Sequence, residues 1–136
     1  MQACAVPYRI RDGHLEVCLV TSIKGRRWIL PKGFVDSGES EPEAALKEAW
    51  EEAGLIGHIV GQRLGTYVHR KYKTELRVSG YLMQVVECRD QWKESHQRRR
   101  CWLSIADAYA QLHREEQRDL LALAVRMLQP SSLQAG

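Results

Sequence analysis

The sequence has no long apolar run. Its longest stretch of apolar residues has six members, Leu120 to Val125, whereas a membrane-spanning helix needs about 20. Residues Met1 to Arg11 contain no basic stretch followed by an apolar one, so no secretory signal is expected. Internal repeats and low-complexity segments are also absent. We therefore predict a cytoplasmic protein that has no membrane partner.

Cysteine pairs with metal-binding spacing are missing as well. The four cysteines are Cys4, Cys18, Cys88 and Cys101, and none of them forms a Cys-x-x-Cys pair. A zinc ribbon is therefore not expected. Each cysteine has apolar neighbours, which is typical of reduced, mostly buried cysteines in an intracellular protein.

The length and composition are those of one globular domain. The chain has 136 residues, and a domain typically has about 100–150. Hydrophobic residues make up 44% and charged residues 27%, which argues against disorder, collagen and coiled coil. We expect a single domain over residues 1–130 and a C-terminal tail at 131–136.

Charged residues are unevenly distributed although the net charge is only +3. Residues 36–52 carry seven acidic side chains and one basic one, and the rest of the chain has a net charge of +9. The acidic segment would suit a bound divalent cation and the basic remainder an anionic ligand. An exposed acidic helix on an ordinary basic surface is the alternative explanation.

Local signals predict an α+β domain. The expected order is strands, one helix, strands and then helices. Ser40 as N-cap and Glu43 at N3 fit a capping box, residues 44–53 are mostly good helix formers, and Gly54 fits a helix stop, so a helix is predicted between Ser40 and Gly54. Later helical pattern extends to Leu128 with a break near residue 113. Strands are expected at 3–9, 15–21, 28–30, 59–69, 75–86 and 98–103.

Three glutamates stand at helical spacing in the acidic segment. Glu48, Glu51 and Glu52 are at i, i+3 and i+4, so a helix places their carboxylates on one face. Like charges at this spacing repel unless something binds between them. Mg²⁺ prefers oxygen ligands and leaves positions open for water and phosphate. The triplet therefore indicates a metal site for phosphoryl chemistry, or otherwise a solvated acidic face.

The segment from Gly33 to Leu55 resembles the Nudix box, Gly-x5-Glu-x7-Arg-Glu-U-x-Glu-Glu-x-Gly-U, where U is a bulky aliphatic residue. Two positions depart from the pattern: Lys47 replaces the usual arginine, and Ala49 is small for the first U. The residues that match are Gly33, Glu39, Glu48, Glu51, Glu52, Gly54 and Leu55. Seven matches over 23 residues make this a specific signal.

The resemblance implies an α/β/α sandwich in which a mixed sheet lies between helices and a loop-helix-loop forms the metal site. It implies that Glu48, Glu51 and Glu52 bind Mg²⁺ or Mn²⁺. The Gly33 carbonyl would help, and Glu39 would assist the metal shell or hold the loop.

The implied reaction is hydrolysis of a phosphoanhydride by metal-activated water. Glu52 is our first choice for the base that takes the water proton, and Glu94 is the second. Lys47 would pair with a carboxylate and orient it, although lysine lacks the bidentate fork of arginine.

Basic clusters outside the box predict a substrate with many phosphates. Their order resembles that of the diphosphoinositol polyphosphate and diadenosine polyphosphate phosphohydrolases within the Nudix superfamily. Trp28, Tyr72 and Trp92 could stack on an adenine or pack against the protein, and Trp50 and Trp102 are assigned to the core. By position, the phosphate clamps would be Arg26, Lys32, Lys71, Lys73, Arg98 and Arg100.

Other functions remain open at this point. The chain could be a Nudix pyrophosphatase acting on ADP-ribose, nucleoside triphosphates or capped RNA. It could also be a non-catalytic nucleotide-sensing Nudix module, although such modules commonly lose box carboxylates. No nucleic-acid partner is expected, because no binding motif is recognised. A monomer or weak dimer is expected.

Overall fold

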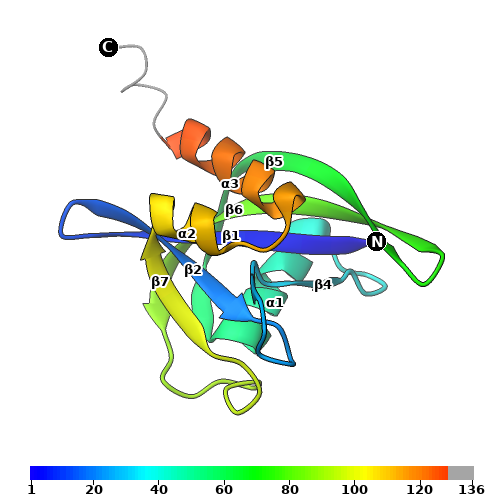
Figure 1. Cartoon of the computed structure of the whole chain (residues 1–136), viewed down its shortest axis with the longest axis horizontal. Coiled ribbons are helices and arrows are strands. Elements are labelled where there is room, and N and C mark those ends of the chain that lie inside the picture. The colour runs from blue at the N-terminus through cyan, green and yellow to red at the C-terminus, as the bar shows by residue number, and fades with distance from the viewer. Residues whose placement is uncertain (129–136) are drawn as a thin grey trace.

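The structure is a computed structural model that describes residues 1–128. The predicted tail at 131–136 lies outside this part of the chain. Figure 1 shows a curved sheet with helices on both faces. The elements in order are β1 (Gln2–Arg11), β2 (His14–Thr21), β3 (Trp28–Ile29), β4 (Lys32–Phe34), α1 (Glu41–Ala53), β5 (Leu55–Lys71), β6 (Thr74–Cys88), β7 (Arg100–Ser104), α2 (Ile105–Gln111) and α3 (Glu115–Leu128).

The sheet is mixed, as predicted. Its main path is β3-β2-β1-β6-β5, while β4 pairs with β1 and β7 pairs with β2. β1 runs parallel to β6 and antiparallel to β2 and β4. The central strand β1 therefore connects the first hairpin, the short strand before the helix and the long β5–β6 hairpin.

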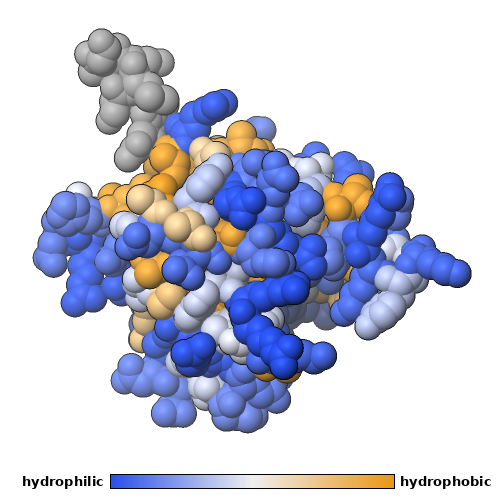
Figure 2. Space-filling view, viewed as in Figure 1, coloured by the Kyte–Doolittle hydropathy of each residue, from blue (hydrophilic) through white to orange (hydrophobic). Residues whose placement is uncertain are grey.

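Two apolar layers hold the helices on opposite faces of the sheet. Successive side chains of a strand point to opposite faces, so Ala3 and Ala5 of β1 pack with α1, whereas Cys4 and Val6 pack with α2 and α3. The face of α1 toward the sheet consists of small residues, Ala44, Ala45, Ala49 and Ala53, all fully buried. These contacts confirm the predicted α/β/α sandwich. Figure 2 shows that the viewed surface is largely hydrophilic.

Helix α1 has the ends that its sequence predicts. The Ser40 hydroxyl accepts a hydrogen bond from the Glu43 amide at 3.2 Å, and the Glu43 carboxylate accepts one from the Ser40 amide at 2.9 Å. Gly54 ends the helix with φ of 67°, in the left-handed region that favours glycine. The predicted break near residue 113 is also confirmed, because α2 ends at Gln111 and α3 begins at Glu115.

Three local predictions differ from the structure. The segment after Pro31, where no strand was predicted, contains strand β4, which pairs with the N-terminal end of β1. Strand β5 begins at Leu55 rather than at residue 59. Its register with β6 shifts near Gly57 and Gly61, which interrupts the regular alternation of side chains, but the pairing with β6 continues through both shifts. Trp50, which was assigned to the core, is 41% exposed.

Candidate active site

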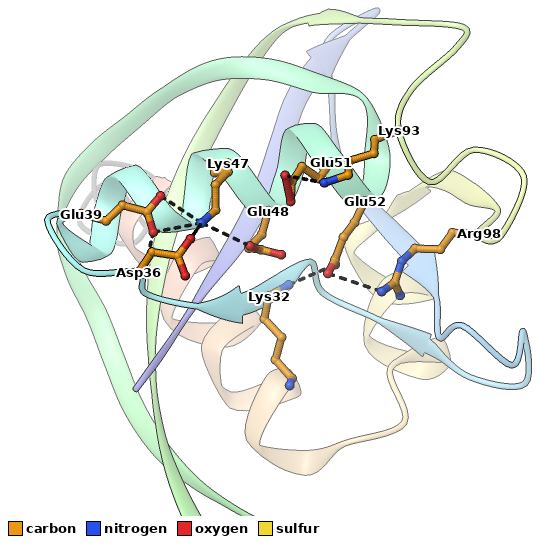
Figure 3. A network of polar contacts seen from close by, with 9 residues as sticks. All are labelled: Lys32, Asp36, Glu39, Lys47, Glu48, Glu51, Glu52, Lys93 and Arg98. Atoms are coloured by element: carbon orange, nitrogen blue, oxygen red, sulfur yellow. Dashed lines mark hydrogen bonds and ion pairs between the residues drawn. The ribbon is translucent and has the colours of Figure 1, made fainter.

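The box residues line an open cleft of about 630 Å³ between β4, α1 and the loop after β6. Its walls include Gly33, Lys47 and the three glutamates of the helical triplet, together with Lys32 and Arg98. Figure 3 shows Glu48 and Glu52 of α1 pointing toward β4, and Glu51 beside Lys93. The helix therefore brings the predicted carboxylates to one place.

Glu52 is the most deeply placed of the three carboxylates. It is only 5% exposed. One oxygen accepts a hydrogen bond from the Lys32 amide of β4 at 3.2 Å, and the other lies 3.4 Å from Nη2 of Arg98. Burial raises the pKa of Glu52 to about 8, and the charge of Arg98 only partly opposes this effect. A raised pKa makes this carboxylate a stronger base than an ordinary glutamate.

Glu48 lies against the backbone of β4. A Cβ atom added at Gly33 would overlap the Glu48 carboxylate, lying 2.7 Å from Oε2 and still closer to Oε1 and Cδ. A glycine is needed here because only its missing side chain lets the carboxylate approach the strand. Burial, reinforced by the neighbouring charge of Glu51, raises the pKa of Glu48.

Lys47 holds the loop before α1. Its ammonium lies 2.7 Å from Oδ2 of Asp36, 3.0 Å from a Glu39 carboxylate oxygen and 3.9 Å from Oε2 of Glu48. Hydrogen bonds to Asp36 and Glu39 raise the pKa of Lys47. Glu39 also accepts a hydrogen bond from the Asp36 amide at 2.8 Å. Lys47 thus links three carboxylates without a guanidinium fork, and Asp36, absent from the sequence prediction, belongs to this group.

Each glutamate of the triplet faces a cation of the chain itself. Glu48 has Lys47 at 3.9 Å, Glu51 has Lys93 at 3.1 Å and Glu52 has Arg98 at 3.4 Å. Lys93 and Arg98 lie on either side of Glu94, whose carboxylate Arg98 also contacts at 2.6 Å. The sequence reasoning missed Lys93, for which only the basic character of the loop gave a signal.

The donor set has the chemistry that a hard divalent cation requires. The three helix carboxylates supply only oxygen, and the missing side chain of Gly33 keeps the backbone of β4 beside them. Within residues 1–128, no three carboxylate, imidazole or thiol side chains are gathered closely enough to enclose an ion. The side chains suit Mg²⁺ or Mn²⁺ because their donor atoms are oxygens and because they line the same cleft. Binding an ion would draw them away from their present cationic partners.

The predicted phosphate clamps lie in several places. Lys32 lines the cleft, but its side chain points away from the α1 carboxylates (Figure 3) and donates to Gln2 at 3.0 Å, and burial lowers its pKa. Lys71 and Lys73 lie at the β5–β6 turn. Arg26 lines a second cleft of about 410 Å³, and Ile23 lines both clefts.

Two predicted clamps contact α1 or its carboxylates. Arg98 is 8% exposed and, besides Glu52 and Glu94, donates to the Thr21 carbonyl at 3.0 Å. Arg100 donates to the Ala53 carbonyl at 2.6 Å. Figure 3 shows Arg98 pointing toward Glu52.

The three candidate stacking aromatics have different surroundings. Trp28 is half-buried, and the Arg99 guanidinium lies 5.6 Å from its ring. Tyr72 is 89% exposed at the hairpin tip. Trp92 packs at the end of α1 and donates to the Glu52 carbonyl at 2.9 Å. Of the three, Tyr72 offers the most open ring.

A family comparison agrees with this site. The model of the NUDIX domain family matches residues 2–124. Because this match covers most of the chain, the chain belongs to the NUDIX domain family. The family and fold predicted from the box are therefore confirmed.

Two curated proteins are similar to this chain over most of its length. Diphosphoinositol polyphosphate phosphohydrolase 3-beta from Homo sapiens is 35% identical over 99 residues, covering 68% of this chain and 57% of that protein. Nudix hydrolase 17, mitochondrial, from Arabidopsis thaliana is 35% identical over 112 residues, covering 76% and 61%. The chain thus spans between half and two thirds of the length of these curated relatives.

A solved structure aligns over nearly the whole chain. The crystal structure of a C. elegans Ap4A hydrolase binary complex has a TM-score of 0.79 and 28% identity, with 93% of this chain and 96% of that chain covered.

None of the helices in residues 1–128 has the length and apolar character needed to cross a membrane.

Proposed function

We propose that this chain is a metal-dependent phosphohydrolase that cleaves phosphoanhydride bonds of a highly phosphorylated substrate. The substrate would be a dinucleoside polyphosphate, such as diadenosine tetra- to hexaphosphate, or a diphosphoinositol polyphosphate. The observation that carries the proposal is the buried Glu52, with its raised pKa, beside Glu48 and Glu51 in one cleft. The names of the human and C. elegans relatives support this substrate class.

The three glutamates, with Gly33 and Glu39, would hold Mg²⁺ or Mn²⁺. When bound, such an ion supplies charge neutralisation and acidifies water. Glu52 accepts the proton of the attacking water, and the Lys32 amide and Arg98 fix the direction of its carboxylate. Lys47 keeps the loop of Glu39 against α1. Glu94 is the second candidate for the base, since Arg98 holds it beside Glu52.

The cationic side chains around the cleft favour a long polyanion. Lys32 is among the residues that line the cleft, and its ammonium has three donors, of which Gln2 takes one. Beyond Ile23, the second cleft is lined by Lys24, Arg26 and Arg27. Phosphates placed at the carboxylates and along these side chains would be bound by several cations at once, which suits substrates with many phosphates better than ADP-ribose.

The test is hydrolysis of a substrate panel by the purified protein with Mg²⁺, with products separated by ion-exchange chromatography. The panel contains diadenosine tetra- to hexaphosphate, an inositol pyrophosphate, ADP-ribose and nucleoside triphosphates. Glu52→Gln should lower kcat by roughly 10²–10⁴-fold, the range for losing a general base. Glu87→Gln is the matched control, because Glu87 pairs with Arg89 on the surface.

Each outcome separates the candidates. Preference for ADP-ribose would retain the mechanism and overturn the polyphosphate assignment. Metal binding without turnover of any compound would favour the sensing module instead. A single domain over 1–130, a monomer or weak dimer and a cytoplasmic location stay predictions.

A further inference from the structure

The loop between β6 and β7 covers the C-terminal end of α1. The last carbonyl groups of a helix have no partner within the helix. Here four consecutive carbonyls each accept one hydrogen bond from residues 89–100. The pairs are Glu94 N to Glu51 O at 3.1 Å, Trp92 Nε1 to Glu52 O at 2.9 Å, Arg100 Nη1 to Ala53 O at 2.6 Å, and Arg89 N to Gly54 O at 2.9 Å.

Two of these donors are side chains that support one another. The Arg100 guanidinium lies 4.2 Å from the centre of the Trp92 ring, a cation–π contact. Its positive charge stands at the negative end of the helix dipole. A Cβ atom at Gly54 would lie 2.9 Å from Nη1 of Arg100 and 3.0 Å from Cβ of Trp92. Gly54 is therefore needed for this close contact as well as for its backbone angle.

The same loop also contacts the acidic side chains of this turn. Lys93 lies 3.1 Å from Glu51, and Arg98 lies 3.4 Å from Glu52. Trp92 and Arg100 bond the backbone of the turn, while the residues between them bond its carboxylates. The position of both carboxylates relative to β4 therefore depends on the attachment of this loop to the helix end.

We infer that Trp92 and Arg100 are positioning residues that fix the last turn of α1 and so place Glu51 and Glu52 for metal binding. The inference rests on the proposed function. It assigns both side chains to the helix end rather than to an adenine or a phosphate.

The test compares Trp92→Phe, which removes the indole N–H but keeps an aromatic ring, with Arg100→Met and the conservative Arg100→Lys. The matched controls are Trp50→Phe, in helix α1, and Arg11→Met, at an exposed position. The readouts are Mn²⁺ affinity by electron paramagnetic resonance, kcat and KM for diadenosine tetraphosphate, and the thermal midpoint Tm.

We expect Trp92→Phe and Arg100→Met each to weaken Mn²⁺ binding and to lower kcat by about tenfold, the lower end of the effect of losing a residue that orients metal ligands. KM should stay within about twofold, Arg100→Lys should recover part of the loss, and the controls should match the wild type.

Three results would overturn the inference. A raised KM with unchanged Mn²⁺ affinity would make these residues substrate contacts. A lowered Tm with unchanged Mn²⁺ affinity and kcat would make their role purely structural. A wild-type protein that binds no Mn²⁺ would leave nothing for them to position. A wild type that binds Mn²⁺ but hydrolyses nothing would instead refute the proposed function, and the Mn²⁺ affinities of the variants would still decide the inference.

Discussion

Replacing Gly33 with alanine should damage activity far more than stability. Gly33 does not have a positive φ, so alanine is compatible with its backbone. The added methyl group would overlap the Glu48 carboxylate, with 2.7 Å to Oε2 and less to Oε1. Overpacking costs about 1–3 kcal/mol of folding stability. The cost should lie at the low end of this range because the displaced group is the mobile end of a side chain. Replacing a glycine also adds roughly 0.4–1 kcal/mol of stability by restricting the unfolded chain.

The net destabilisation should be about 0–1 kcal/mol, which corresponds to a fall in Tm of at most roughly 4–5 °C for a domain of this size. Displacing Glu48 from β4 should nevertheless reduce kcat and Mg²⁺ affinity by at least about tenfold, or roughly 1.4 kcal/mol of transition-state stabilisation. Calorimetry and Mg²⁺ titration of the hydrolysis rate measure the two effects separately.

The double variant Gly33→Ala with Glu48→Asp is the control. Shortening Glu48 by one methylene makes room for the new methyl group, so the alanine should cost less stability in this background than in the wild type, without restoring activity. Full activity and unchanged Mg²⁺ affinity in Gly33→Ala would refute the argument that the missing side chain places Glu48.

Three further predictions concern the support of the site. Ser40→Ala removes the hydroxyl that caps α1 and should cost about 1 kcal/mol in chemical unfolding; an unchanged midpoint would contradict this. Lys47→Arg should keep kcat within about twofold because it preserves the charge between Asp36 and Glu39, whereas Lys47→Met should lower it; equal rates would show that the charge is dispensable. Burial and a hydrogen bond to Glu41 raise the pKa of Tyr81 to about 12. Its contribution to stability is therefore present below pH 10 and is lost as the pH rises through 12, so unfolding curves at pH 9 and 11.5 should show a larger loss for the wild type than for Tyr81→Phe.

The parts predicted from sequence are those that local rules determine. The capping box and Gly54 set the ends of α1 through neighbouring residues, and helical spacing alone places Glu48, Glu51 and Glu52 together. Strand β4 escaped prediction because proline and glycine usually break strands, and its pairing with β1 joins residues about 30 positions apart.

The cations of the site are also non-local. Lys93 and Arg98 meet glutamates more than 40 positions earlier in the chain, and no spacing in the sequence indicates such a pair. Arg100 was predicted by position as a phosphate clamp, and Trp92 as a residue that either stacks on an adenine or packs against the protein. Only the docking of their loop on the helix end shows that they bond its carbonyls.

The pairing of each box glutamate with a lysine or arginine has a consequence for handling the protein. These cations offset part of the repulsion among the three acids within the chain, so we expect the fold not to depend on a divalent ion to relieve it. Chelators should therefore yield a folded apoprotein, unlike a domain whose metal supplies the folding energy. Lys93, with a side chain 67% exposed, can swing into solvent when an ion arrives and return when it leaves. Loading and stripping would then be a reversible exchange of counterions.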